Sequence, residues 1–228
     1  MKLRWLAILF VATTAAAQSV QPPDTLPAPA ATKLGANLAA ARAHASSVWR
    51  DTPPINADGT INGYVEIARG DRRKWEFNMA ANARQIDRMI PESIGGYPIN
   101  YGFVPQTVSY DGDPFDVLVL GPPIEGGSLV RGLPVGVMRM EDDRILDSKV
   151  VITPLDAHGK PRFRITDSVR REVSRFFNRY KRHVPGASTS VAGWGSKDEG
   201  IAFVQMTHAF FRQCRDRAGA ECVATRTK

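Results

Sequence analysis

The chain has 228 residues and a net charge of +7, with 30 Lys and Arg residues against 23 Asp and Glu. The length suits one domain. No segment after the first 17 residues is apolar enough to span a membrane, and no internal repeat is visible. These features exclude an integral membrane domain and a repeat array.

The first residues have the layout of a secretory signal peptide. Met1 to Arg4 is a short positive start, Trp5 to Val11 is apolar, and Ala15 to Ala17 offer a cleavage site before Gln18. The apolar stretch is too short to span a bilayer. We therefore expect residues 1–17 to be a signal peptide and the protein to be exported, periplasmic or secreted; the alternative is a buried N-terminal helix.

Residues 18–60 are predicted to be a Pro/Ala-rich linker with a short helix. Residues 18–32 contain Pro22-Pro23 and suggest a disordered or polyproline segment. A helix over residues 31–49 would place Leu34, Leu38, Ala41 and Ala45 on one stripe, although Gly35 weakens it. The sequence assigns no function to this helix.

From Tyr64 to Ile152 the chain shows short strands broken by Gly and Pro, which predicts a small closed barrel. The part that follows is predicted to be helical. One helix buries a face made by Val169, Val173, Phe176, Phe177 and Tyr180, and it turns arginines to the other side. A solvated basic face explains these arginines better than nucleic-acid binding. Ser196 and Glu199 have capping-box spacing and open a second helix through Phe211.

The two cysteines, Cys214 and Cys222, are predicted to form a disulfide. An exported chain meets oxidising conditions, and the eight-residue spacing across Gly219 allows a small loop.

Three aspartates in six residues, Asp111, Asp113 and Asp116, indicate a metal site. Neighbouring carboxylates repel each other and resist burial unless a cation lies among them. Their hard oxygen atoms suit Mg²⁺, Mn²⁺ or Ca²⁺. A plain turn is the alternative. An EF-hand-like loop does not fit, because Phe115 stands at a ligand position and Asp116 at the glycine position.

The surrounding pattern strengthens the metal hypothesis. Residues 117–120 form a short apolar run that predicts a buried strand directly after the aspartates. In extended backbone, Asp147 shares a face with Lys149, and Lys74 shares one with Glu76. Carboxylates that hold metals and lysines that hold phosphate oxygens would account for both pairs. A surface strand with alternating charges is the alternative reading.

From about Gly63 to about Trp194 the chain carries an ordered series of charged and aromatic motifs: Glu66-Ile67, Lys74-Trp75-Glu76, Asp87-Arg88, Tyr97 to Gly102, Asp111 to Val117, Asp142, Asp147-Ser148-Lys149 and Tyr180-Lys181. In this order and spacing they resemble the motifs of the soluble family I inorganic pyrophosphatases. The chain departs from the family at Ala68, in the short basic segment 161–168, and at residues 186–190, which lack lysines that some members carry.

The resemblance implies an α+β fold with a mainly β core, a five-stranded, OB-like closed barrel with flanking α-helices. It places a pyrophosphatase domain at residues 61–215 and a tail at 216–228. It implies hydrolysis of inorganic pyrophosphate to two orthophosphates by in-line attack of a metal-bound hydroxide. The cofactor would be several Mg²⁺ ions per site, with Mn²⁺ as a substitute. We also expect a homo-oligomer.

The resemblance also implies a role for each site residue. Asp113 would be catalytic and accept the proton of the nucleophile. Six carboxylates would hold metal ions: Asp111, Asp116, Asp147, Asp142, Glu66 and Glu76. Seven side chains would bind the substrate: Lys74, Arg88, Tyr97, Tyr101, Lys149, Tyr180 and Lys181.

Two other classes stay open at this point. A barrel with net positive charge suits a nucleic-acid binder, although the acidic cluster would repel a phosphate backbone. A non-catalytic metal- or phosphate-binding protein is the other alternative, and no motif residue is missing to favour it.

Overall fold

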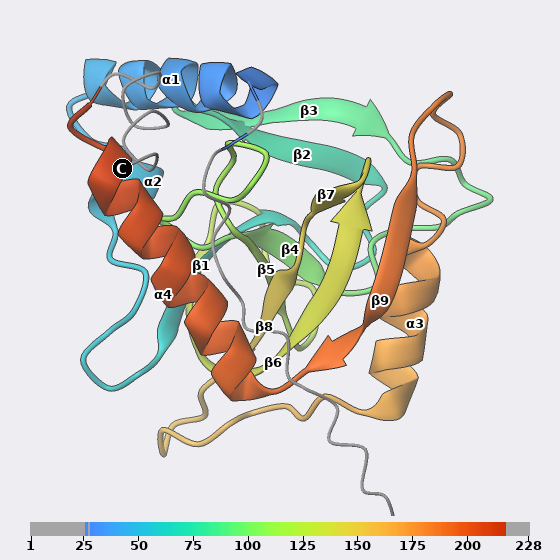
Figure 1. The fold of residues 1–228 in the computed structure, drawn as a ribbon. Helices are drawn as coiled ribbons and strands as arrows, with labels where there is room; N and C mark the ends of the chain where they lie inside the picture. Colours follow the sequence, from blue (N-terminus) through green and yellow to red (C-terminus); the bar gives the residue numbers. More distant parts are fainter. Residues whose placement is uncertain (1–25, 27, 218–228) are drawn as a thin grey trace, which may run out of the picture.

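The computed structural model describes Leu26 and residues 28–217. Its centre is a sheet, with α1 (Ala28–Ala43) lying across one end, α4 (Lys197–Cys214) across one face, and α3 (Asp167–Phe177) beside the outer strand (Figure 1). No helix in this described part is long and apolar enough to cross a membrane.

Five strands pair in a closed ring, which confirms the predicted five-stranded core. The order is β1 (Ile61–Ile67), β4 (Asn100–Phe103), β5 (Asp116–Val119), β8 (Lys149–Pro154) and β6 (Leu129–Asp142). Pairing of β1 with β6 closes the ring, so none of the five has a free edge along the path. β7 (Ile145–Leu146) and β9 (Thr189–Gly195) also pair with β6. β2 (Arg73–Asn78) forms a separate hairpin with β3 (Ala83–Met89).

The interior of the ring is built from β-branched residues. Val65, Val117, Val150 and Ile152 have no measurable exposure and pack in one cluster, as expected for strands buried on both faces. Gly102 allows β4 to approach β1, since a Cβ atom there would lie 1.8 Å from the Tyr64 carbonyl oxygen. This rigid core fixes the strand ends that carry the acidic residues.

The two C-terminal helices follow the sequence pattern with one correction. Thr166 caps α3, which buries Val173, Phe176 and Phe177. It ends at Phe177, so Tyr180 lies in the turn that follows and not on the helix as predicted, although Tyr180 is buried. The Ser196 hydroxyl accepts from the Glu199 amide at 3.2 Å and caps α4, which runs three residues past the predicted end.

The N-terminal helix is shorter than predicted. α1 begins at Ala28, inside the segment predicted to be disordered or polyproline, and it ends at Ala43. Trp49 belongs to a separate short helix, α2 (Val48–Asp51). Ala45 therefore lies between them and is exposed, not on the buried stripe. Leu34, Leu38 and Ala41 are buried as the pattern requires. Gly35 is accommodated within the helix.

Four sequence predictions concern residues that lie wholly or mostly beyond the described part. They are the signal peptide, the Pro-rich linker, the C-terminal tail and the cysteine pairing. Cys214 is buried and disulfide-bonded. Its predicted partner, Cys222, lies outside the described residues, so this pairing stays a prediction.

Candidate functional site

The acidic loop, residues 111–115, leads directly into β5. Its turn depends on Gly112, which has a φ of +86° that other residues rarely adopt. The Asp113 amide donates to Asp111 Oδ1 at 3.0 Å, so the first carboxylate holds the turn. Asp116 is the first residue of β5 and is anchored in the ring.

Parallel pairing of β5 with β8 brings a lysine to these aspartates. Val117 is opposite Val150, so Asp116 and Lys149 stand at equivalent positions, one residue before this pair. The Lys149 ammonium, only 1% exposed, contacts Asp116 and lies 2.8 Å from Asp147 Oδ2. Tyr101 donates its hydroxyl to Asp116 Oδ2 at 2.7 Å. Asp147 and Lys149 therefore share a face, as the sequence predicts.

The β2–β3 hairpin contributes a second group of charges. Lys74 contacts Glu76 and lies 3.3 Å from Asp87 Oδ2. Arg88 Nη1 donates to Asp87 at 2.6 Å, while Arg88 Nε and Nη2 are buried without a hydrogen-bond partner among the described residues. Such unpaired guanidinium nitrogens are unfavourable unless an acceptor binds there. Glu66, on β1, is buried and accepts from the Phe77 amide at 2.6 Å.

A third group joins the end of β6 to the turn after α3. Tyr180 donates its hydroxyl to Asp142 Oδ2 at 2.9 Å. Lys181 contacts Asp142 and lies 3.3 Å from Asp143 Oδ2. Lys181 thus contacts Asp142, another of the predicted site residues, but it comes from a turn and not from the edge of α3.

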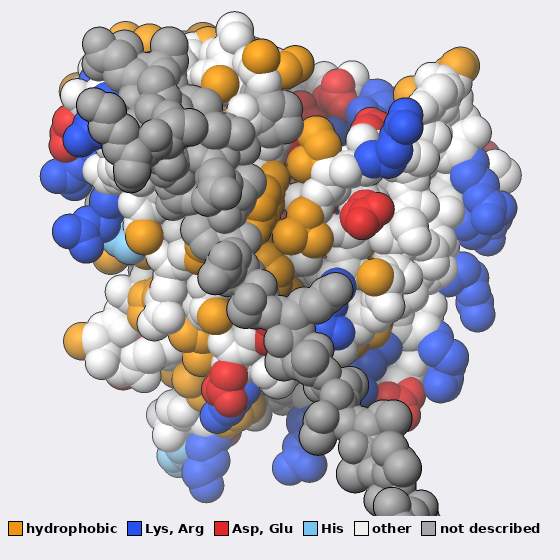
Figure 2. Space-filling model, in the orientation of Figure 1, with side chains coloured by type: hydrophobic (Ala, Val, Ile, Leu, Met, Phe, Trp, Pro, Cys, Tyr) orange, Lys and Arg blue, Asp and Glu red, His pale blue; other side chains and the backbone are white. Residues whose placement is uncertain are grey.

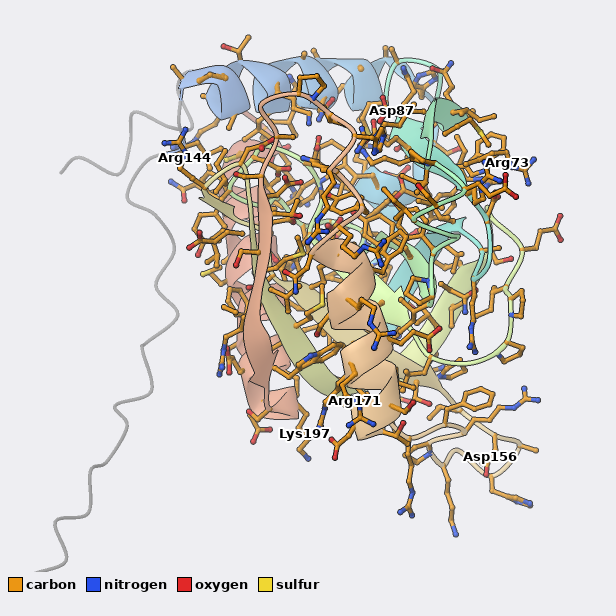
Figure 3. The ribbon with its side chains drawn as sticks, turned by 90° about the vertical axis from the view of Figure 1, so that its right-hand side faces the viewer. Arg73, Asp87, Arg144, Asp156, Arg171 and Lys197 are labelled. Atoms are coloured by element: carbon orange, nitrogen blue, oxygen red, sulfur yellow. The ribbon has the colours of Figure 1, made fainter. Side chains whose placement is uncertain are left out.

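A cavity of about 500 Å³ opens on the acidic loop and the hairpin. Asp87 lies at this end of the molecule, beneath α1 (Figure 3). Six of the predicted site residues line the cavity: Glu66, Lys74, Glu76, Tyr101, Asp113 and Asp116.

Tyr97 lies elsewhere. It is 1% exposed, and its ring packs 4.7 Å from the Phe176 ring in an apolar cluster. It does not line the cavity, and neither do seven other predicted site residues: Arg88, Asp111, Asp142, Asp147, Lys149, Tyr180 and Lys181. Its contact with Tyr101, at 5.5 Å between ring centroids, indicates a supporting position behind the cavity wall.

Burial dominates the electrostatics of the acidic groups. It raises the pKa of Asp111, Asp147 and Glu66 above the usual carboxyl range. Burial and the neighbouring Asp111 raise the pKa of Asp113 to about 7. Burial alone would lower the pKa of Lys149, but Asp116 and Asp147 outweigh it and raise that pKa. The carboxylates therefore favour additional positive charge.

The residues fit a cation site whose carboxylate ligands come together when the ions bind. No three His, Cys, Asp or Glu side chains in the described part stand together as a ready-made ligand set. Lysine ammonium groups instead contact Asp113, Asp116, Asp147 and Asp142. The donors are all carboxylate oxygens, which suit hard divalent cations, and lysine side chains are long enough to move aside.

Sequence reasoning missed two contributors to the cavity. In the sequence, only the position of Asp87 next to Arg88, a predicted substrate-binding residue, suggested that it belongs to the site. Lys33, on α1, contacts Asp113 from 80 residues away. No local pattern connects these two positions.

Most of the charged face near α3 is solvent-exposed surface. Basic side chains crowd the edge of the molecule beside α3 (Figure 2), and Arg171 is labelled on the lower part of that helix (Figure 3). Arg171 and Arg175 are exposed, which agrees with the solvated reading of this face.

The acidic loop, the β2–β3 hairpin and the end of β6 all carry carboxylates paired with lysines, an arrangement that suits an anionic substrate bound together with cations. The family model for inorganic pyrophosphatases matches residues 63–212. The chain belongs to the inorganic pyrophosphatase family, whose members hydrolyse pyrophosphate to phosphate.

Individual relatives agree with the family match. The chain is 39% identical over 149 residues to the inorganic pyrophosphatase of Aeropyrum pernix, covering 62% of this chain and 84% of that one. It is 33% identical over 162 residues to that of Sulfolobus acidocaldarius, covering 68% and 93%. Among solved structures, the Thermus thermophilus enzyme matches with a TM-score of 0.65 at 29% identity, covering 73% and 99%. The Coxiella burnetii enzyme matches at 0.63 and 34%, covering 70% and 99%.

Proposed function

We propose that this chain hydrolyses inorganic pyrophosphate in a reaction that depends on Mg²⁺, with Mn²⁺ as a substitute. The observation that carries the proposal is the buried contact of Lys149 with both Asp116 and Asp147, with Tyr101 bound to Asp116, in a chain of this family. Pyrophosphate is a polyanion that repels a nucleophile of the same charge. A site for it needs positive charge on both sides of the reacting phosphorus atom.

The residues that would hold the cations are the buried oxygen donors. Asp111, Asp116 and Asp147 would hold the innermost metal ions. The single Lys149 ammonium contacts both Asp116 and Asp147, so one cation can bind these two carboxylates together. Glu66, Glu76 and Asp142 would contact further ions at the rim. When bound, the ions would neutralise the substrate and make water a stronger nucleophile.

The cationic side chains would orient the two phosphate groups. Arg88 has two unpaired guanidinium nitrogens, which match two oxygen atoms of one phosphate. Lys74, Lys149 and Lys181 each contact a carboxylate, and each would leave it to bind a phosphate oxygen of the substrate. The Tyr101 and Tyr180 hydroxyls would hold Asp116 and Asp142 in place while the lysines move.

Asp113 would accept the proton of the attacking water. It lines the cavity and keeps 38% of its side chain exposed, so a water molecule can reach it. Burial and the neighbouring Asp111 raise its pKa above the usual carboxyl range, which favours uptake of a proton. In an in-line displacement the water oxygen forms the new P–O bond on one side of the phosphorus atom while the bridging P–O bond breaks on the opposite side and releases the second phosphate.

A phosphate-release assay on pyrophosphate with and without Mg²⁺ tests the proposal. We expect release only when the cation is present, and restoration by Mn²⁺ after treatment with a chelator. A nucleic-acid binder would release no phosphate and would bind oligonucleotides. A non-catalytic phosphate-binding protein would bind pyrophosphate without turning it over.

The turn after α3 gives a matched pair of variants. Lys181→Ala should lower kcat/KM for pyrophosphate by more than about tenfold at saturating Mg²⁺, because it removes a cation that contacts Asp142. Arg182→Ala should stay within about twofold, since Arg182 is exposed. Equal effects of the two substitutions would contradict the proposed role of Lys181.

We further propose that the protein is exported and forms a homo-oligomer. The support for export is the layout of residues 1–17 together with a single pair of cysteines. Intact-mass measurement on native material should give a chain that starts at or near Gln18 and carries one Cys214–Cys222 bond. A retained Met1 leader, or two free thiols under non-reducing conditions, would contradict this prediction.

A further inference from the structure

Helix α1 lies outside the matched region of residues 63–212, yet it is firmly packed on the site. Its apolar side is buried: Leu34 has no measurable exposure and Leu38 has 3%, in a cluster with Trp49 and Phe211. A Cβ atom on Gly112 would lie 2.3 Å from the Ala30 carbonyl oxygen. The helix backbone therefore touches the turn of the acidic loop, and α1 is a fixed wall.

The other side of α1 faces the cavity. Lys33, Ala36, Asn37 and Ala40 line it, across from residues of the β2–β3 hairpin (Figure 1). Asn37 Nδ2 lies 3.4 Å from the Gly112 carbonyl oxygen and 3.5 Å from Asp113 Oδ1. Two polar residues of α1, one turn apart, thus contact the same short loop.

Lys33 brings a charge that the matched region does not supply. Its ammonium contacts Asp113, and its side chain remains 51% exposed. Lys74, Lys149 and Lys181 make equivalent contacts with site carboxylates, but all three belong to residues 63–212. A long, half-exposed lysine on a fixed helix can contact Asp113 or swing into solvent without moving its backbone.

We propose that the Lys33 ammonium, which α1 holds beside the acidic loop, neutralises the carboxylates of that loop in place of a metal ion. Its ammonium competes with the divalent cations proposed to bind beside Asp113, so α1 sets the metal concentration at which the site fills. This inference deepens the proposed function, on which it rests for the identity of the site. A positive group held beside the loop weakens binding of every further cation there, because the two charges repel at short range.

The test is a titration of the full chain with Mg²⁺ and then Mn²⁺, without substrate, by calorimetry or thermal shift. Lys33→Met should tighten binding of the first ion by about five- to tenfold, the order expected for removal of one partly exposed charge. Lys33→Arg should keep the wild-type affinity. Arg42→Met is the matched control: it removes one charge from the same helix, where Arg42 donates to the Arg215 carbonyl oxygen at 2.8 Å.

Each outcome has one meaning. Unchanged metal affinity in Lys33→Met overturns the inference, whether or not KM for pyrophosphate rises. Equal tightening in Lys33→Met and Arg42→Met also overturns it, because the effect would then be one of net charge. A wild-type protein that binds Mg²⁺ but releases no phosphate, with the shift present in Lys33→Met, refutes the proposed function and supports the inference.

Discussion

Asp113→Asn should reduce kcat for pyrophosphate by a factor on the order of 10²–10⁴, the usual contribution of a positioned acid or base. The amide keeps the shape of the side chain but cannot accept the proton of the attacking water. The cations and lysines that bind substrate remain, so KM should change far less. Steady-state kinetics at saturating Mg²⁺ would show this separation.

Asp198→Asn provides the control for Asp113→Asn. It makes the same chemical change at an exposed position in the first turn of α4, and its kcat should stay close to that of the wild type. Near-normal turnover in Asp113→Asn would refute the role of Asp113 as base.

The contact with Lys33 requires one further comparison. Asp113 also contacts Lys33 on α1, so its substitution removes an ion pair as well as a base. In a Lys33→Met background that contact is already absent. A full loss of kcat on adding Asp113→Asn to this background would assign the effect to chemistry, whereas no additional loss would assign it to the contact.

The sequence predicted the local structure well where a short-range pattern determines position. Alternation puts Asp147 and Lys149 on one face, and the apolar run after Asp116 places that residue at a strand end. The capping pair Ser196 and Glu199 located the start of α4. In each case neighbours along the chain are neighbours in space, so a short window contains the information.

Long-range packing explains what the sequence did not show. The stripe of Leu34 and Leu38 predicted a helix, but its place over the acidic loop depends on contacts with Phe211 and Gly112. Tyr180 continued the apolar period of α3, yet the helix ends before it. A buried residue in a turn satisfies the same period, so periodicity cannot locate the end of the helix.

Lys149→Met should destabilise the protein by about 3–5 kcal/mol in the presence of a chelator, the usual cost of removing one partner of a buried ion pair. Methionine has a similar volume, so packing is largely kept. Asp116 and Asp147 would lose the ammonium that both contact. Thermal or denaturant unfolding measures the loss, and Lys160→Met, at an exposed loop position, should have little effect.

Cations and pH should both reduce the loss in Lys149→Met. Mg²⁺ should narrow the gap to the wild type, since an ion among Asp111, Asp116 and Asp147 replaces the missing charge. Burial already raises the pKa of Asp147 above its unfolded value. A carboxyl whose pKa is higher in the folded than in the unfolded state destabilises the fold when the pH is above both pKa values. This destabilisation disappears once the pH falls below both values, because the group is then protonated in both states. The gap should therefore shrink as the pH falls through the carboxyl range. A variant as stable as the wild type in chelator at neutral pH would show that Asp116 and Asp147 do not depend on Lys149 for their charge.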